Sequence, residues 1–202
     1  MSSFNEIFSR PPVDDQPEIE ERPEWSGPPD GEIGVAVPLS LVVARSESAA
    51  VALRSATAYT TGAILYFYAV VRGITSREMT MLFHSQHLSE HDADPPDEFL
   101  RLGIEIADGE RVSNLGNPRL HSWKPGVTPE GPILAPQGGS SGGSRPGRVT
   151  LDQAYWLWPL PPPGLLRVFA EWPRYDVGLS GAELDTRALL EAGERSRALW
   201  DD

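Results

Sequence analysis

The chain has 202 residues, a formal net charge of −12 and no cysteine. This length fits one domain with attached tails, and the negative charge disfavours nucleic acid as a partner because phosphate backbones would be repelled. The lack of cysteine excludes disulfides and thiolate metal sites. The N-terminal sequence shows neither the basic nor the apolar region of a signal peptide, and no apolar run approaches the roughly 18 residues that span a bilayer. We therefore expect a cytoplasmic protein without membrane contact.

Residues 1–32 are rich in proline and contain nine acidic residues against two arginines. Such a segment buries too little apolar surface to offset the entropy of ordering, which predicts a disordered acidic tail. Near its start, Phe4, Ile7 and Phe8 are spaced as on one side of a helix, within a capping-box pattern. We interpret these three residues as a candidate partner-binding motif that folds onto a groove of a partner or onto the body of this protein. The alternative is a frayed tail with incidental apolar residues.

From Ile33 to Val43, apolar side chains recur at every second residue, as in a strand with one buried face. Pro38 lies within this run, and because proline cannot donate to a ladder, it predicts a sheet edge or a bulge. Asp108-Gly109 is a two-residue turn signal between two alternating segments, which predicts a β-hairpin. The strands predicted from such patterns run near residues 33–44, 49–58, 62–72, 99–107, 110–115, 150–159 and 165–173.

Two segments have helical periodicity and are predicted as helices, one near residues 76–90 and one near residues 186–200. The first contains His84, His87 and His91, spaced so that their imidazoles share one side of a helix. Because His84 and His91 would lie about 10.5 Å apart along the axis, one ion could take only His84–His87 or His87–His91, with a carboxylate from elsewhere. The alternative is the polar face of a surface helix.

Residues 116–148 lack periodicity and include a glycine-serine run, GGSSGGS. A stretch this long is typical of a flexible loop or of a boundary between two domains. The residues that follow offer only a hairpin and a helix, which is too little to close a core of their own. We therefore expect one β-rich domain over residues 33–202 that carries a flexible loop at 116–148.

The segment Leu151–Pro173 contains three tryptophans, two strand-like apolar runs and a proline-rich corner, which predicts a hairpin docked on the first sheet. Aromatic faces beside a carboxylate can bind a carbohydrate or a cation. The residues of such a candidate ligand platform are Trp156, Trp158, Glu171 and Trp172. The simpler alternative is that tryptophans at strand spacing pack in the core.

Two stretches of the chain, LRLGIEIADGERVSNLG and YWLWPLPPPG, resemble a β-rich family of hypothetical proteins from high-GC actinobacteria. The resemblance covers residues 24–200 and implies a single domain. It implies no activity, no cofactor and no site residue.

The serines of the glycine-serine run lie in a stretch too flexible to hold an oxyanion hole, and the run lacks the GK[ST] ending of a phosphate-binding loop. The sequence therefore predicts a mainly β fold: an antiparallel β-sandwich of about seven strands with a mid-chain helix and a C-terminal helix. For function, we expect a non-enzymatic protein-interaction module that needs no cofactor and binds another protein. The alternatives are a metal- or carbohydrate-binding protein and a structural subunit of a larger assembly.

Overall fold

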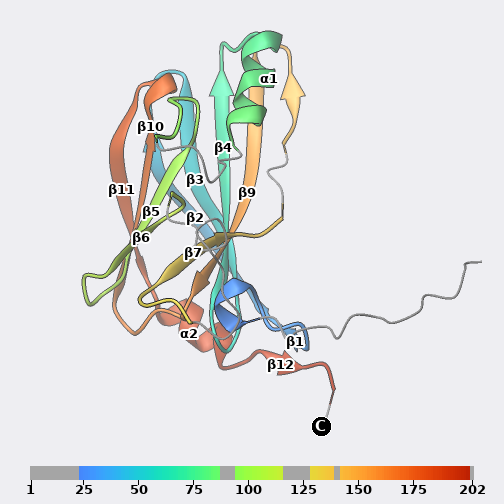
Figure 1. Cartoon of the computed structure of the whole chain (residues 1–202), viewed down its shortest axis with the longest axis vertical. Coiled ribbons are helices and arrows are strands. Elements are labelled where there is room, and N and C mark those ends of the chain that lie inside the picture. The colour runs from blue at the N-terminus through green and yellow to red at the C-terminus, as the bar shows by residue number, and fades with distance from the viewer. Residues whose placement is uncertain (1–22, 87–93, 116–127, 139–141, 201–202) are drawn as a thin grey trace, which may run out of the picture.

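The computed structural model describes residues 23–86, 94–115, 128–138 and 142–200. In this part of the chain, two antiparallel sheets face each other across a shared apolar layer, which confirms the predicted β-sandwich (Figure 1). The six-stranded sheet has the order β2 (Val35–Arg45), β3 (Ala49–Ala58), β4 (Ala63–Arg72), β9 (Arg148–Trp158) and β7 (Ile133–Pro136), with β8 (Ser144–Arg145) also paired to β9. The four-stranded sheet has the order β11 (Val177–Asp185), β10 (Leu165–Trp172), β5 (Arg101–Glu105) and β6 (Arg111–Ser113). A short ladder joins β1 (Glu32–Ile33) to β12 (Arg197–Ala198).

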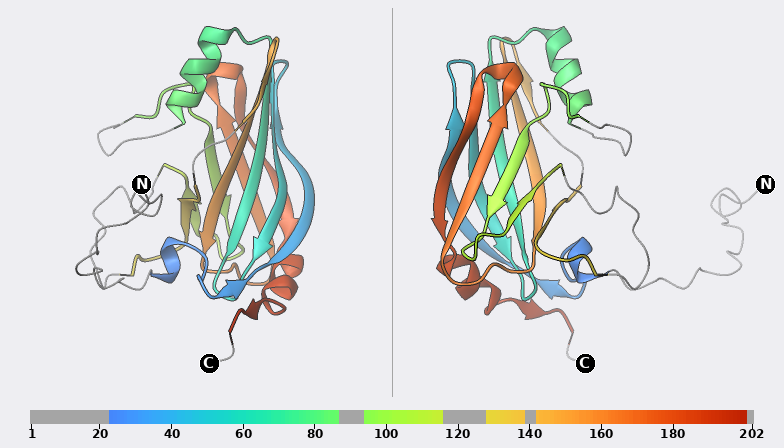
Figure 2. Two further views of the ribbon diagram at one scale, coloured as in Figure 1. Left: turned by 90° about the vertical axis from the view of Figure 1, so that its right-hand side faces the viewer. Right: turned by 60° about the vertical axis from the view of Figure 1, so that its left-hand side comes forward.

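The two helices lie at opposite ends of the sandwich (Figure 2). The mid-chain helix, α1 (Ser76–Ser85), begins with a capping box: the Thr75 hydroxyl accepts a hydrogen bond from the Glu78 amide, and the Glu78 carboxylate accepts one from the Thr75 amide. The C-terminal helix, α2 (Arg187–Gly193), is shorter than predicted because the chain then turns to form β12. Short 3-10 turns are η2 (Glu24–Ser26) and η3 (Pro173–Tyr175). Among the described residues, the helices are too short and too polar to cross a bilayer.

Alternate residues of the central strands build the shared apolar layer, as a period of two requires. From the six-stranded sheet, β4 contributes its buried residues Ala63, Leu65, Phe67, Ala69 and Val71. The opposite wall comes from β5 and β10 with Leu102, Ile104, Leu166, Val168, Ala170 and Trp172. Leu82 of α1 and Leu189 of α2 belong to the same cluster, so both helices are anchored in this layer.

All seven strand segments predicted from the sequence are strands in the structure. β2 is an edge strand, and its pairing with β3 shifts register between Pro38 and Leu41, so the proline marks both an edge and a bulge. A hairpin at Asp108-Gly109 is also confirmed, but its loop has three residues, 107–109, rather than two. The Ile106 amide donates to the Glu110 carbonyl, the Gly109 amide donates to the Ile106 carbonyl, and Gly109 has a positive φ of 91°.

The predicted hairpin over Leu151–Pro173 is wrong. Its first strand, β9, pairs with β4 in the six-stranded sheet, whereas its second strand, β10, pairs with β5 and β11 in the other sheet. The residues between them include four prolines, which have no amide hydrogen to continue a ladder. This connection therefore carries the chain from one sheet to the other.

Four strands of the described structure lie where the sequence predicted none: β7, β8, β11 and β12. β7 falls inside the predicted flexible loop at 116–148, yet Ile133, Leu134 and Ala135 are buried against β9. β11 lies between the predicted strand at 165–173 and the predicted C-terminal helix, where the sequence assigned no element. These two escaped prediction because β7 is too short to show a period and β11 is interrupted by Gly178 and Gly181.

Residues 23–32, the described part of the segment predicted as a disordered tail, pack against the six-stranded sheet. Trp25 is only 3% exposed and packs with Ile133, Ala135 and Trp156 in a second apolar cluster on the outer side of the six-stranded sheet. The Trp156 indole donates a hydrogen bond of 3.0 Å to the Glu24 carbonyl. One buried aromatic side chain thus anchors the segment that precedes β1.

Replacing Trp25 by alanine is expected to lower the free energy of unfolding by about 3 kcal/mol, because a large buried side chain is lost and a cavity remains. Trp200→Ala is the matched control: this side chain is 69% exposed, and its loss should cost less than about 0.5 kcal/mol. Urea unfolding followed by circular dichroism measures both. Equal effects of the two substitutions would contradict the anchoring role of Trp25.

Candidate functional site

The outer face of the four-stranded sheet is arranged in rows, because residues paired across antiparallel strands point to the same side. One row crosses all four strands and consists of Gly181, Phe169, Gly103 and Ser113. Phe169 is the one large side chain in this row, and glycine stands on either side of it.

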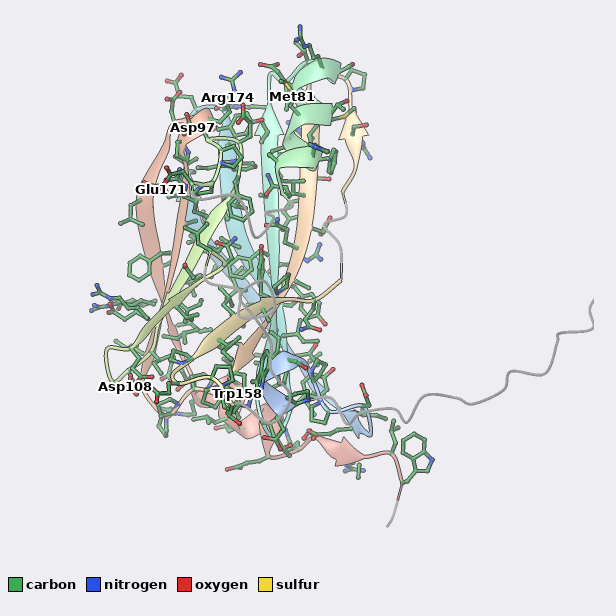
Figure 3. The ribbon with its side chains drawn as sticks, in the orientation of Figure 1. Met81, Asp97, Asp108, Trp158, Glu171 and Arg174 are labelled. Carbon is green, nitrogen blue, oxygen red and sulfur yellow. The ribbon has the colours of Figure 1, made fainter. Side chains whose placement is uncertain are left out.

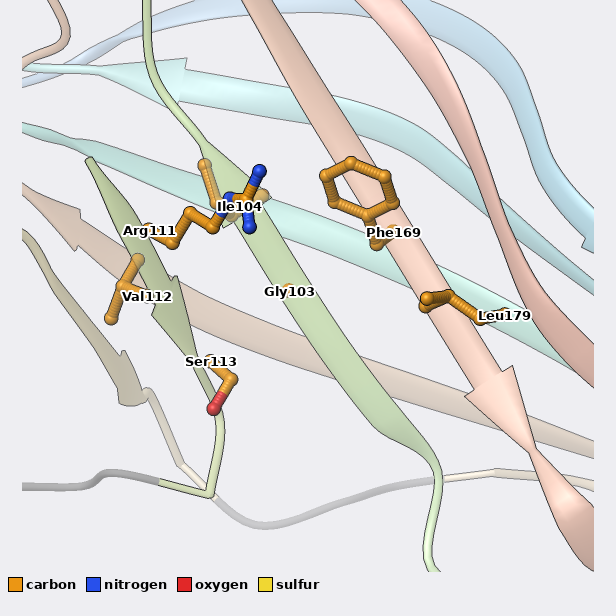
Figure 4. A pocket seen from close by; sticks show the side chains of 7 residues that line it. All are labelled: Gly103, Ile104, Arg111, Val112, Ser113, Phe169 and Leu179. Atoms are coloured by element: carbon orange, nitrogen blue, oxygen red, sulfur yellow. The ribbon is translucent and has the colours of Figure 1, made fainter. Parts of the chain in front are cut away.

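Phe169 lies toward β11 and leaves space above β5. A Cβ atom at Gly181 would come within 2.8 Å of Phe169 Cδ1, whereas the nearest atom to a Cβ at Gly103 would be Phe169 Cβ at 3.6 Å. Because Gly103 has no side chain, a hollow of about 450 Å³ opens above it (Figure 4). The hollow is lined by Gly103, Ile104, Arg111, Val112, Ser113, Phe169 and Leu179.

Ion pairs border this hollow along the strands. The neighbouring row alternates in sign across the sheet as Glu183, Arg167, Glu105 and Arg111. Arg167 Nε lies 3.0 Å from Glu183 Oε1, and Arg167 Nη1 lies 3.0 Å from Glu105 Oε1. On the other side of Phe169, Arg101 Nη1 donates to Glu171 Oε2 at 2.7 Å; Glu171 is labelled in Figure 3. The surface is therefore an apolar hollow between rows of mutually neutralised charges.

The charged states of this row follow from its hydrogen bonds. The hydrogen bond from Arg111 is the largest cause that lowers the pKa of Glu105, and it outweighs the opposing effect of burial. Hydrogen bonds to Glu183 and Glu105 raise the pKa of Arg167. Glu105 and Arg167 are thus ionised at neutral pH. With two glutamates and two arginines, the formal charge of the row is zero.

The structure does not bring together the four residues of the candidate ligand platform. Trp156 and Trp158 belong to the six-stranded sheet, whereas Glu171 and Trp172 belong to the four-stranded sheet, and Trp158 and Glu171 are well separated in Figure 3. Trp156 and Trp172 are fully buried, and their indole groups donate to the carbonyls of Glu24 and Glu98, respectively. The core alternative therefore describes these two tryptophans.

The other candidate residues are only partly within the described structure. His84 is exposed near the end of α1, while His87 and His91 lie outside the described residues, as do Phe4, Ile7 and Phe8. Within the described ranges, no three histidine, cysteine, aspartate or glutamate side chains lie close enough together to hold a metal ion.

The hollow was not predicted, although one signal for it was present in the sequence. Gly103 interrupts a strand in which Leu102 and Ile104 face inward and Arg101 and Glu105 face outward. A glycine on the outer side of a strand marks a place where another group approaches the backbone closely. The two glycines that flank Phe169 could not be recognised as its neighbours, because register is not visible in the sequence.

Searches against family models, curated proteins and solved structures gave no match to this chain. The resemblance to the actinobacterial family stays a prediction.

The two glycines beside Phe169 should respond in opposite ways to an added methyl group. Gly103→Ala should raise the free energy of unfolding by up to about 1 kcal/mol, since the Cβ fits and glycine disfavours the strand. Gly181→Ala should lower it by about 1–3 kcal/mol, because its Cβ would overlap the Phe169 ring. Urea unfolding measures both, and a stabilising effect at Gly181 would refute the position of the ring.

The Glu105 ion pairs should make stability depend on pH. Because the pKa of Glu105 is lower in the folded than in the unfolded chain, their contribution is complete above the ordinary value of 4.5 and is lost as the pH falls through the folded-state pKa. Glu105→Gln should therefore be less stable than the parent at pH 7, and this difference should shrink below pH 4.5. Unfolding curves at a series of pH values measure the effect. A constant difference at every pH would contradict it.

Proposed function

We propose that this protein is a non-enzymatic protein-interaction module and that the hollow beside Gly103 receives an apolar side chain of its partner. The observation that carries the proposal is the open space above Gly103, next to the Phe169 ring and between rows of ion pairs. Protein interfaces are commonly arranged in the same way, with an apolar centre that loses its water on binding and a polar rim around it.

Exposed apolar side chains extend the surface beyond the hollow. Leu179 is 72% exposed and Leu165 is 50% exposed, and they lie on β11 and β10, respectively. Exposure of an apolar side chain to water is unfavourable in free energy, and a partner that covers the side chain would remove this cost. The proposed contact therefore runs from the hollow over the outer side of β10 and β11.

The charge of this surface also favours a protein partner. The chain as a whole carries −12, which repels other acidic surfaces. Around the hollow, however, Glu105 and Glu183 are compensated by Arg111 and Arg167, and Glu171 by Arg101. A partner that approaches here meets little net charge. We include a cytoplasmic location in this proposal, in keeping with a chain that has no cysteine.

Filling the hollow is the direct test. Gly103→Leu places an isobutyl group in the open space without a clash at Cβ, so the fold should be retained while the partner's side chain is excluded. Capture of a specific partner from a lysate of the source cells, quantified by mass spectrometry, should fall at least about tenfold, as for loss of an interface hot spot.

Ser40→Leu is the matched control, because it adds the same side chain at an exposed position of β2 on the other sheet. Capture by Ser40→Leu should equal that of the parent. Deletion of residues 1–12 measures separately the contribution of Phe4, Ile7 and Phe8. Undiminished capture by Gly103→Leu would refute the hollow as the contact surface.

A further inference from the structure

Three arginines stand in one row on the outer face of the six-stranded sheet. Arg72 of β4 pairs with Arg148 of β9, and Arg148 also pairs with Arg145 of β8 across a tight turn. Side chains of directly paired residues point to the same side, with their Cβ atoms about 4.5–5.5 Å apart. All three are exposed. These three residues are the arginine row. A fourth arginine, Arg45 of β2, lies in the next row of the sheet, because it pairs with Ala50 and, through it, with Val70.

This arrangement costs free energy in the isolated chain, because like charges directly opposite each other on a sheet are destabilising. The four-stranded sheet shows the opposite pattern, in which Glu183, Arg167, Glu105 and Arg111 alternate in sign. Nearly every basic residue of the chain is arginine, so the use of arginine rather than lysine here does not indicate a ligand. The position of three arginines in one row does indicate one.

No carboxylate of the described residues forms an ion pair with any arginine of this row. Arg72 Nε donates to the backbone carbonyl of Glu47, a neutral acceptor that does not compensate the charge of the guanidinium group. Asp152, further along β9, is already paired with Arg54 at 3.0 Å. Glu47 is exposed at the turn after β2 and is, within the part of the chain that the structure describes, the one acidic residue that lines this region. A concentrated positive charge thus persists on a strongly acidic protein.

The surface around the row is hollowed on both sides of Arg148. One hollow of about 250 Å³ is lined by Arg45, Arg72 and Arg148, and another of about 400 Å³ by Arg145, Arg148 and Tyr68, among others. An anion in either hollow would meet more than one guanidinium group. Arginine binds the oxygens of phosphate through two parallel, charge-assisted hydrogen bonds.

From the shared row and the two hollows, we propose that the arginine row binds a phosphate group, carried either by a soluble molecule or by a lipid headgroup. The bound phosphate would offset the repulsion among Arg72, Arg145 and Arg148. Because the hollows meet at Arg148, a ligand with two adjacent phosphates binds more tightly than one with a single phosphate. This site lies on the other sheet from the hollow beside Gly103 and does not depend on the proposed function.

The soluble source is tested by isothermal titration of the full chain with pyrophosphate and with inorganic phosphate at constant ionic strength. Pyrophosphate should bind saturably and more tightly than phosphate. The lipid source is tested by co-sedimentation with vesicles of phosphatidylcholine with and without phosphatidylglycerol. Saturable binding in either arm supports the proposal and identifies the source, and binding in neither arm overturns it.

The double variant Arg72→Gln/Arg148→Gln should weaken that binding at least about tenfold, since each lost charge-assisted hydrogen bond is costly. Arg195→Gln/Arg197→Gln removes the same charge at the opposite end of the sandwich and should leave binding unchanged. Equal weakening by both pairs would show a non-specific charge effect and refute the site.

The melting temperature is a second measurement, and it can be made on the double variant even if that variant binds no phosphate. Without added anion, Arg72→Gln/Arg148→Gln should melt at or above the temperature of the parent, because like-charge repulsion is removed. Pyrophosphate should raise the melting temperature of the parent and not that of the variant. A variant that melts well below the parent would show that the row is structural, which contradicts the proposal.

Discussion

Burial of one apolar layer between the two sheets is the constraint on which the rest of this structure depends. Phe67 and Leu65 on one side and Trp172 and Val168 on the other leave each strand a single acceptable register, since a shift by one residue would expose its entire inner face. The same register decides which side chains become neighbours on the outer faces. Both surface features of the protein, the hollow beside Gly103 and the arginine row, are therefore consequences of how the interior is paired.

The outer faces of the two sheets have opposite charge patterns. On the four-stranded sheet, the pairing of Glu105 with Arg111 and Arg167 cancels charge around the apolar hollow. On the six-stranded sheet, Arg148 faces two further arginines, so positive charge is concentrated there. The protein contact proposed for the first surface would be a dry one, which salt would affect little. The second suits a ligand whose binding weakens as salt is added.

Local features of the fold could be predicted from the sequence, and long-range pairing could not. Three short patterns each predicted an element correctly, because each acts over only a few residues. The alternation from Ile33 to Val43 predicted a strand, Pro38 predicted its edge position and bulge, and Asp108-Gly109 predicted a hairpin. The partner of β10 depends instead on where the chain goes after Pro163, which no short pattern encodes. For the same reason Glu171 was recognised as a carboxylate of interest, while its partner Arg101, seventy positions earlier, was not. The row of Arg72, Arg145 and Arg148 becomes visible only once β4, β8 and β9 are side by side.

The interleaving of the two sheets along the chain has a consequence for biosynthesis. β4 ends at Arg72, but β9, its neighbour in the sheet, is complete only at Trp158, after β5 and β6 of the other sheet have been made. At about 5–20 residues per second, a nascent chain waits on the order of several seconds with the edge of β4 unpaired. An unfinished apolar sheet therefore emerges from the ribosome before the strand that completes it has been synthesised, as a direct result of the strand order.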